Sequence, residues 1–220
     1  MRTWQSPNQD ERGVPIDMLV FHYTGMRSAE AALDRLCDPA AKVSSHYLIT
    51  EEGVVHALVP EEKRAWHAGL SFWAGTRNVN GCSIGIELVN PGHEFGYRAF
   101  PDAQIAALKN LSLGILARHA IPASRVLGHS DVAPARKDDP GELFPWEALA
   151  ADGIGIWPGE GRGFSPASQL VEFGYDPQVP LEKTITAFQR HFRASHLTGQ
   201  WDEECGALLA GLLGSGLLAK

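Results

Sequence analysis

The chain has 220 residues, of which 44% are hydrophobic and 20% charged, and its formal net charge is −7. This length and composition predict an ordinary globular protein with room for one sizeable domain and a smaller one. The negative net charge and the absence of long Lys and Arg runs argue against nucleic acid or an anionic membrane surface as a partner. No apolar run approaches the roughly 18 to 20 residues that span a bilayer, so no membrane span is expected.

The first 150 residues alternate between strand patterns and helix patterns. Strand-forming residues dominate three segments: 16–24, 42–60 (two strands around a Glu-Glu-Gly turn) and 82–90. Apolar residues recur at helical spacing in two segments: 28–38, with Ser28 in position to cap it, and 102–120. These segments predict one sheet covered by helices, in an α/β or α+β domain that ends near residue 150.

The composition changes after residue 150. Residues 151–165 are rich in glycine and are expected to form a linker or a wrapping segment. Three short helical patterns follow in residues 166–220, and they predict a small three-helix domain. The expected division is therefore a large domain in residues 1–150, a linker, and a small helical domain.

Nine histidines are present, and most have ordinary structural explanations. His46 and His56 alternate with apolar residues and are expected to be hydrogen-bonded strand residues. Solvated positions are expected for four others: His93, His119, His191 and His196. His22 and His129 differ, because each stands at the end of a predicted strand.

The segment GHSDVAPARKDDPG, residues 128–141, has two prolines, no helical period and no strand alternation. Irregular segments held by a rigid scaffold often carry chemistry. His129 opens the segment, and Asp139 lies ten residues further on. Together with His22, they would leave a tetrahedral zinc one open position, as a catalytic zinc requires. Taken alone, each histidine is more often structural than a metal ligand, so the spacing leaves both interpretations open.

Five motifs occur in order along the chain: VFHYTG, SSHYLI, AWHAG, NGCSIGIELVN and GHSDVAPARKDDPG. Together they resemble the type 2 zinc N-acetylmuramoyl-L-alanine amidases, whose fold also occurs in peptidoglycan-recognition proteins and phage amidases. The likeness spans roughly residues 15 to 147. It implies an α/β fold with a mixed central sheet flanked by helices, and a zinc amidase domain in residues 1–150.

By position, the resemblance implies one zinc ion per chain on three ligands: His22, His129 and Asp139. It also implies that Lys137 faces the scissile carbonyl and that Glu87 is the acidic residue on the facing strand. Phage members have a Tyr directly before the His of the second strand, whereas this chain has Ser45. This difference favours Glu87 as the base over a Tyr-assisted mechanism.

General chemistry supports these implied roles. A zinc ion lowers the pKa of its bound water toward about 7 and polarises a carbonyl group. Glu87 would carry a proton from that water to the leaving amine, and Lys137 would stabilise the oxyanion. The structural alternatives are a hydrogen-bonded Glu87 and a solvated Lys137 beside Asp138.

The resemblance further implies that the AWHAG loop lines the substrate groove. Candidate contacts to sugar or peptide are Trp66, His67, Asn80, Arg77 and Arg136. An aromatic ring can stack on a sugar, and a guanidinium can meet a peptide carboxylate. The alternatives are a Trp66 that packs in the interior and an exposed Arg136 without a ligand.

The chain from roughly residue 166 to residue 213 resembles a three-helix peptidoglycan-binding domain, and a helical cap on the first domain is an equal alternative. The predicted function is zinc-dependent hydrolysis of the amide between N-acetylmuramic acid, or its 1,6-anhydro form, and L-alanine in peptidoglycan or soluble muropeptides. Recognition of muropeptides without cleavage is the alternative. The lack of a signal segment predicts a cytoplasmic protein, whereas an export signal removed from the sequence would place it in the periplasm.

Overall fold

The computed structural model describes residues 4–159 and 163–216 and centres on a five-stranded sheet. Its strands, in spatial order, are β4 (Val55–Ala57), β3 (Tyr47–Ile49), β6 (Ser83–Leu88), β2 (Met18–Tyr23) and β7 (Val126–Gly128). All pairs are parallel except β3 with β4. A separate two-stranded sheet pairs β1 (Gln9–Glu11) with β5 (Lys63–Ala65). The predicted mixed sheet is therefore confirmed.

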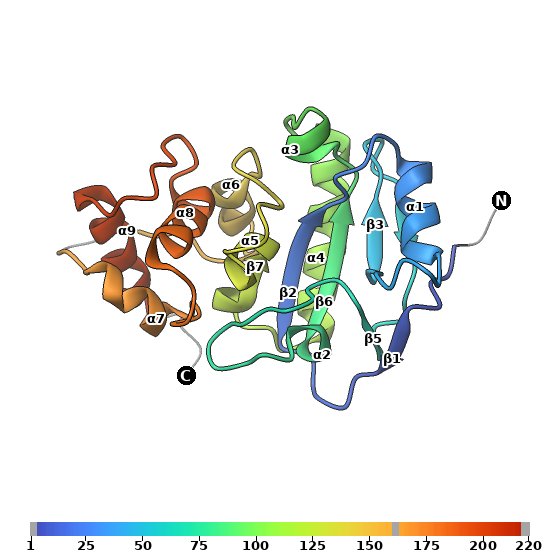
Figure 1. The fold of residues 1–220 in the computed structure, drawn as a ribbon, viewed down its shortest axis with the longest axis horizontal. Helices are drawn as coiled ribbons and strands as arrows, with labels where there is room; N and C mark the ends of the chain where they lie inside the picture. Colours follow the sequence, from blue (N-terminus) through green and yellow to red (C-terminus); the bar gives the residue numbers. More distant parts are fainter. Residues whose placement is uncertain (1–3, 160–162, 217–220) are drawn as a thin grey trace.

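Helices cover both faces of the main sheet (Figure 1). The long helix α4 (Asp102–Arg118) and the short α6 (Trp146–Ala151) pack on one face in a shared apolar cluster with β2 and β6. Helix α1 (Ala29–Cys37) covers the other face around Leu48, and its N-cap Ser28 accepts a hydrogen bond from the next turn, as predicted. The other helical turns here are α2 (Val79–Cys82), α3 (Gly92–Phe95), η1 (Ala123–Arg125) and α5 (His129–Val132).

Side-chain alternation in the central strands decides which residues reach the α1 face. Phe21 of β2 belongs to the apolar cluster beneath α4. Successive strand residues point to opposite faces of a sheet, so His22 points away from α4. Glu87 of β6 lies opposite His22 in the parallel register and shares its face. Two residues that the sequence singled out are thus brought to one face of the sheet.

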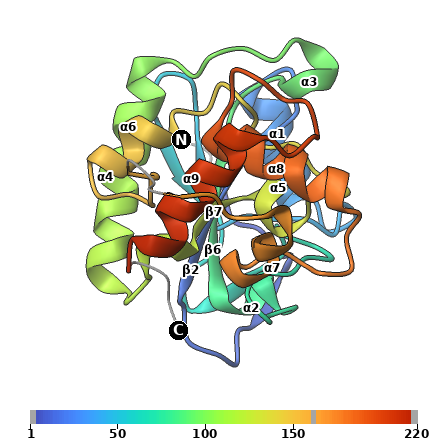
Figure 2. The ribbon, with the colours of Figure 1, turned by 90° about the vertical axis from the view of Figure 1, so that its left-hand side faces the viewer.

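Three C-terminal helices stand beyond the edge strand β7: α7 (Leu170–Phe173), α8 (Leu181–Phe192) and α9 (Glu203–Gly214) (Figure 2). A 3-10 turn, η2 (Ala167–Gln169), precedes α7. Apolar residues of these helices form one buried cluster with Met18 and Val20 of β2. The three predicted helical patterns are therefore helices, and they share a core with the sheet. Across the described residues, no helix combines the length and apolar character that a membrane span needs.

The segment between the two parts wraps against the sheet instead of standing free. Ile154 and Ile156 are buried in the apolar clusters of the sheet. The division into 1–150, 151–165 and 166–220 stays a prediction. Three short stretches of those segments, 1–3, 160–162 and 217–220, lie outside the described residues.

The structure differs from the sequence-based expectations at two points. Residues 128–141 are not irregular throughout but begin with the turn α5, because the Asp131 carboxylate accepts the N–H of Gly128 and caps it. His191 is not solvated but only 4% exposed, since α8 turns it onto Asp131. His46, in contrast, is buried and accepts a backbone hydrogen bond, as predicted.

Candidate metal centre and active site

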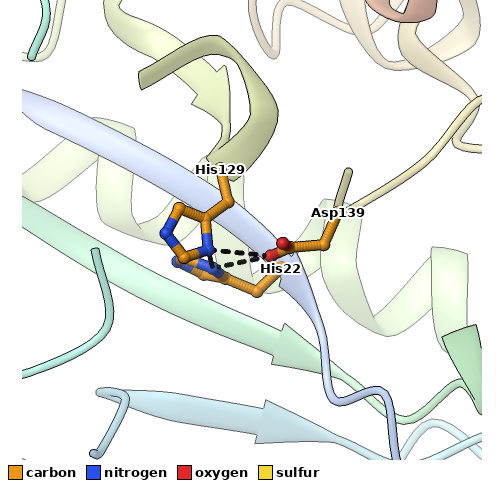
Figure 3. A group of neighbouring side chains, drawn as sticks. All are labelled: His22, His129 and Asp139. Carbon is orange, nitrogen blue, oxygen red and sulfur yellow. Dashed lines mark hydrogen bonds and ion pairs between the residues drawn. The ribbon is translucent and has the colours of Figure 1, made fainter. Parts of the chain in front are cut away.

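Three of the predicted site residues meet at the carboxyl edge of the parallel strands. His22 lies near the end of β2, His129 follows β7 directly, and Asp139 lies on the loop after α5. Parallel neighbours bring their carboxyl ends to one edge, which is where open α/β sheets bind ligands. The three side chains converge there, as Figure 3 shows.

The three residues form a tight and buried cluster. Nδ1 of His22 lies 3.0 Å from Nδ1 of His129, and Oδ2 of Asp139 lies 3.0 Å from each of these nitrogens. Their exposed fractions are 1%, 3% and 6% for His22, His129 and Asp139. Within the described residues, this is the one group of His, Cys, Asp or Glu side chains arranged so that three of them could hold a metal ion.

The hydrogen bonds around the cluster leave it rich in lone pairs. Nε2 of His129 lies 3.1 Å from the carbonyl oxygen of Ala68 and must donate, which leaves Nδ1 as the ring nitrogen that faces His22 and Asp139. Burial, the largest cause, lowers the pKa of His22 to about 4, so this ring is neutral near pH 7. Bare nitrogens beside a carboxylate oxygen are unfavourable unless a positive charge, a proton or a metal ion, stands among them.

Glu87 is a buried carboxyl group beside the cluster. It is 9% exposed, lines the same pocket as His129 and Asp139, and its Oε2 has no hydrogen-bond partner within the described part of the chain. Burial, the largest cause, and the charge of Asp139 raise the pKa of Glu87 while Lys137 opposes both, and the net pKa is about 8. An unpartnered carboxyl group with a pKa near neutrality is suited to carrying a proton.

Lys137 lines the pocket, and its neighbour Asp138 pairs with a residue of the C-terminal part of the chain. The carboxylate of Asp138 accepts from the guanidinium of Arg190 of α8 at 2.9 Å. Lys137 makes no ion pair with any described carboxylate, and its ammonium is close enough to lower the pKa of Glu87. The alternative from the sequence was a solvated Lys137 beside Asp138, whereas the structure has Lys137 half-buried at the pocket.

A pocket of about 360 Å³ opens beside the cluster. One wall comes from α1 and the residues around it: Met26, Ala32, Arg35, Leu36 and Val43. Another wall holds Arg136, Lys137 and Asp138. Three cationic side chains therefore line this pocket together with three carboxyl groups, those of Glu87, Asp138 and Asp139.

The predicted substrate contacts fall in different places. Arg136 lines the pocket while its guanidinium donates to the carbonyl of Ala68 at 2.9 Å. His67 also lines the pocket but is only 5% exposed. Trp66 and Asn80 are not among the pocket-lining residues, and Asn80 instead accepts hydrogen bonds from the backbone N–H groups of His67 and Ala68. Their roles toward a substrate stay predictions.

Arg77 and Ser45 each have a partner within the protein. Arg77 pairs with Asp176 at 3.2 Å and lines a second pocket of about 320 Å³, which Arg136 also lines. The hydroxyl of Ser45 donates to the carbonyl of Tyr47 at 2.9 Å. Ser45 therefore has a structural hydrogen bond at the position where phage members have Tyr.

Sequence reasoning missed two residues of this region. Arg35 of α1 lines the pocket, but helical periodicity identifies only the apolar side of α1. Asp131 supports the turn that carries His129, although its place two residues after His129 in the GHSD motif was visible. A polar residue three positions after a strand end is a recognisable capping signal.

Comparisons with known proteins agree with the fold. A family described as N-acetylmuramoyl-L-alanine amidase matches residues 12–142. The N-acetylmuramoyl-L-alanine amidase AmiD of Escherichia coli is 40% identical over 230 residues, covering 90% of this chain and 82% of AmiD. The fold and the site together define the class of the protein: an α/β protein whose buried cluster is suited to hydrolysis. The chain belongs to the N-acetylmuramoyl-L-alanine amidase family, so the resemblance and fold class predicted from the sequence are confirmed.

Two solved structures extend the similarity to the C-terminal helices. A complex of E. coli AmiD with the substrate anhydro-N-acetylmuramic acid-L-Ala-D-gamma-Glu-L-Lys has a TM-score of 0.81 at 37% identity and covers 98% of this chain and 92% of that one. AMPDH3 from Pseudomonas aeruginosa, in complex with anhydromuramic pentapeptide, has a TM-score of 0.83 at 34% identity, and the match covers 99% of this chain and 97% of AMPDH3.

Proposed function

We propose that this protein is a zinc-dependent hydrolase that cleaves the amide bond between N-acetylmuramic acid, or its 1,6-anhydro form, and the L-alanine of the stem peptide. One observation carries the proposal: the buried acceptor atoms of His22, His129 and Asp139 converge beside the unpartnered carboxyl group of Glu87. Family membership supplies the class of bond, and the cluster supplies the means to break it.

The donor set fits zinc. Two imidazole nitrogens and one carboxylate oxygen are ligands that zinc prefers, and three protein ligands leave a fourth position for water or substrate. A metal ion also relieves the repulsion among three lone-pair atoms that lie 3.0 Å apart. A zinc ion bound there supplies a water of lowered pKa and polarises the scissile carbonyl.

The remaining steps fall to residues of the chain. Glu87 accepts the proton of the attacking water and returns it to the leaving amine of L-alanine. Lys137 donates to the carbonyl oxygen as negative charge develops on it. Both residues line the pocket, where Glu87 is 9% exposed.

Two arginines of the pocket fit the carboxylates of a stem peptide. The peptide bound to E. coli AmiD contains a γ-linked glutamate, whose α-carboxylate remains free. Arg35 and Arg136 line the pocket of this chain and are placed to meet such carboxylates. A soluble muropeptide is therefore the proposed substrate. Residues 166–220 are separately proposed to be a wall-binding domain, which would make polymeric peptidoglycan a second substrate.

The test is mass spectrometry of the products after incubation with anhydro-muropeptide and, separately, with intact sacculi, each with and without a zinc chelator. Release of free stem peptide that stops on chelation and returns with zinc is the expected result. Binding without release, by protein shown to hold zinc, would contradict the proposal and support recognition without cleavage. Pelleting of the protein with sacculi tests wall binding separately from cleavage.

A further inference from the structure

A fourth buried residue, His67, stands directly behind His22. Its Nδ1 lies 3.0 Å from Nε2 of His22, the ring nitrogen that faces away from the cluster. Its own Nε2 lies 3.2 Å from the hydroxyl oxygen of Ser83. His22, His67 and Ser83 are all at most 5% exposed, so water does not compete for these contacts.

His22, His67 and Ser83 form a row of hydrogen bonds, and the hydroxyl group of Ser83 at its end sets the direction of each bond. The hydroxyl of Ser83 lies 2.5 Å from the carbonyl oxygen of Val79, a distance that requires the single hydroxyl proton to lie between them. Ser83 therefore accepts from His67, whose proton must be on Nε2. No carboxylate of the described residues contacts the buried ring of His67, so a positive charge on it would stay uncompensated; the ring is therefore neutral and its Nδ1 is bare.

The bare Nδ1 of His67 then decides the state of His22. It can only accept, so Nε2 of His22 carries a proton. In a neutral imidazole the other nitrogen, Nδ1, is left with its lone pair directed at His129 and Asp139. The free lone pair is what a metal ligand needs, and an outer hydrogen bond of this kind fixes tautomer and ring orientation.

Packing holds His67 in place from two further sides. A Cβ atom added at Gly85 of β6 would lie 2.4 Å from the His67 ring, so the ring lies directly on a strand that has no side chain there. The side-chain oxygen of Asn80 accepts the backbone N–H of His67 at 3.1 Å. These contacts hold His67 against β6.

We propose that His67, oriented by Ser83, is a positioning residue that fixes the Nε2–H tautomer of His22 and so presents Nδ1 of His22 to the metal ion. The metal's identity rests on the proposed function, whereas the tautomer is a property of the protein alone. This assigns His67 a role behind the metal centre instead of a contact with sugar or peptide.

The first test compares two nearly isosteric variants, His67→Leu and His67→Asn. Both leave similar space above Gly85, but only Asn offers an oxygen near the position of Nδ1. Zinc affinity, measured by competition with a chelator, should fall by about 10- to 100-fold in His67→Leu and by clearly less in His67→Asn. Equal losses in both variants would assign the effect to packing, and unchanged affinity in both would overturn the proposal.

The second test needs neither zinc nor activity. Long-range ¹H–¹⁵N correlation spectra of the metal-free protein should show Nε2 of His22 protonated, and His67→Leu should raise the population with a proton on Nδ1. An unprotonated Nε2 in the wild-type protein would overturn the proposal whatever the metal affinity. If the wild-type protein failed to bind zinc but showed this tautomer, the proposed function would fail and the hydrogen-bond chain would stand.

Discussion

The hydroxyl of Tyr175 donates a hydrogen bond to Oδ1 of Asp131 over 2.9 Å, and both residues are buried. The other oxygen of Asp131 accepts from the N–H of Gly128 at 2.7 Å and lies 2.8 Å from Nδ1 of His191. Tyr175 and His191 belong to the C-terminal part of the chain, whereas Asp131 caps the turn that starts at His129. The C-terminal part of the chain therefore supports His129, a residue of the candidate metal site, through the carboxylate of Asp131.

Tyr175→Phe should lower the free energy of unfolding by about 1–3 kcal/mol, because it leaves a buried carboxylate oxygen without its donor. Urea unfolding of the zinc-loaded protein measures the change. Tyr47→Phe is the control, since the half-buried hydroxyl of Tyr47 also bonds a carboxylate, that of Glu61, which keeps Arg118 and His119 as partners. A loss in Tyr175→Phe no larger than in the control would show that the junction does not depend on this bond.

Glu87→Gln and Asp139→Ala separate turnover from metal binding. Glu87→Gln keeps the shape of the side chain and removes the base, so kcat should fall by about 10²- to 10⁴-fold while zinc content stays unchanged. Asp139→Ala removes a ligand from the buried cluster, so both zinc and activity should be lost. Zinc content by atomic absorption and rates on anhydro-muropeptide give the two readouts. A fully active Glu87→Gln protein would refute the assignment of the base.

The central strands and the cluster could be predicted because their signals are local. β2 and β6 are buried along their length, and strands of this kind appear in a sequence as continuous apolar runs. His22 and His129 lie at the ends of predicted strands, and the parallel pairing of β2 with β7 brings both ends to one edge, while the set of three ligands, with Asp139, came from the resemblance.

The supporting residues could not be predicted in the same way, because their partners are distant in sequence. The contact between His191 and Asp131 joins residues 60 positions apart, and nothing in the sequence of α8 distinguishes His191 from a solvated histidine. The role of His67 also depends on the tertiary fold, which places a loop on β6. One signal was present: an isolated glycine inside the strand, Gly85, indicates that another group approaches the backbone closely.

Lys137→Met should lower kcat by about 10²- to 10³-fold, since it removes the cation placed to stabilise the oxyanion. Zinc content should not change, because Lys137 does not belong to the cluster. The matched control is Lys183→Met, on the C-terminal helix α8 and away from the residues that line the pocket. Steady-state kinetics on anhydro-muropeptide measure both variants, and equal rates for Lys137→Met and wild type would rule out the proposed role.

Glu61 should make part of the stability dependent on acid pH. Burial alone would raise the pKa of this carboxyl group, but hydrogen bonds from Arg118, His119 and Tyr47 outweigh burial and lower the pKa to about 2. A carboxyl group whose pKa is lower in the folded state than its ordinary 4.5 stabilises the fold above that value, and this contribution is lost as the pH falls toward about 2.

Glu61→Gln removes this titration, so the stability difference between wild type and variant should be constant near neutral pH and should shrink as the pH falls below about 4.5. Thermal unfolding of the metal-free proteins across this range measures the difference without interference from acid loss of zinc. Gln carries no charge with which Arg118 can pair, so the variant should be less stable than the wild type above about pH 4.5. A difference that stays the same at every pH would show that the ionised form of Glu61 does not contribute to stability.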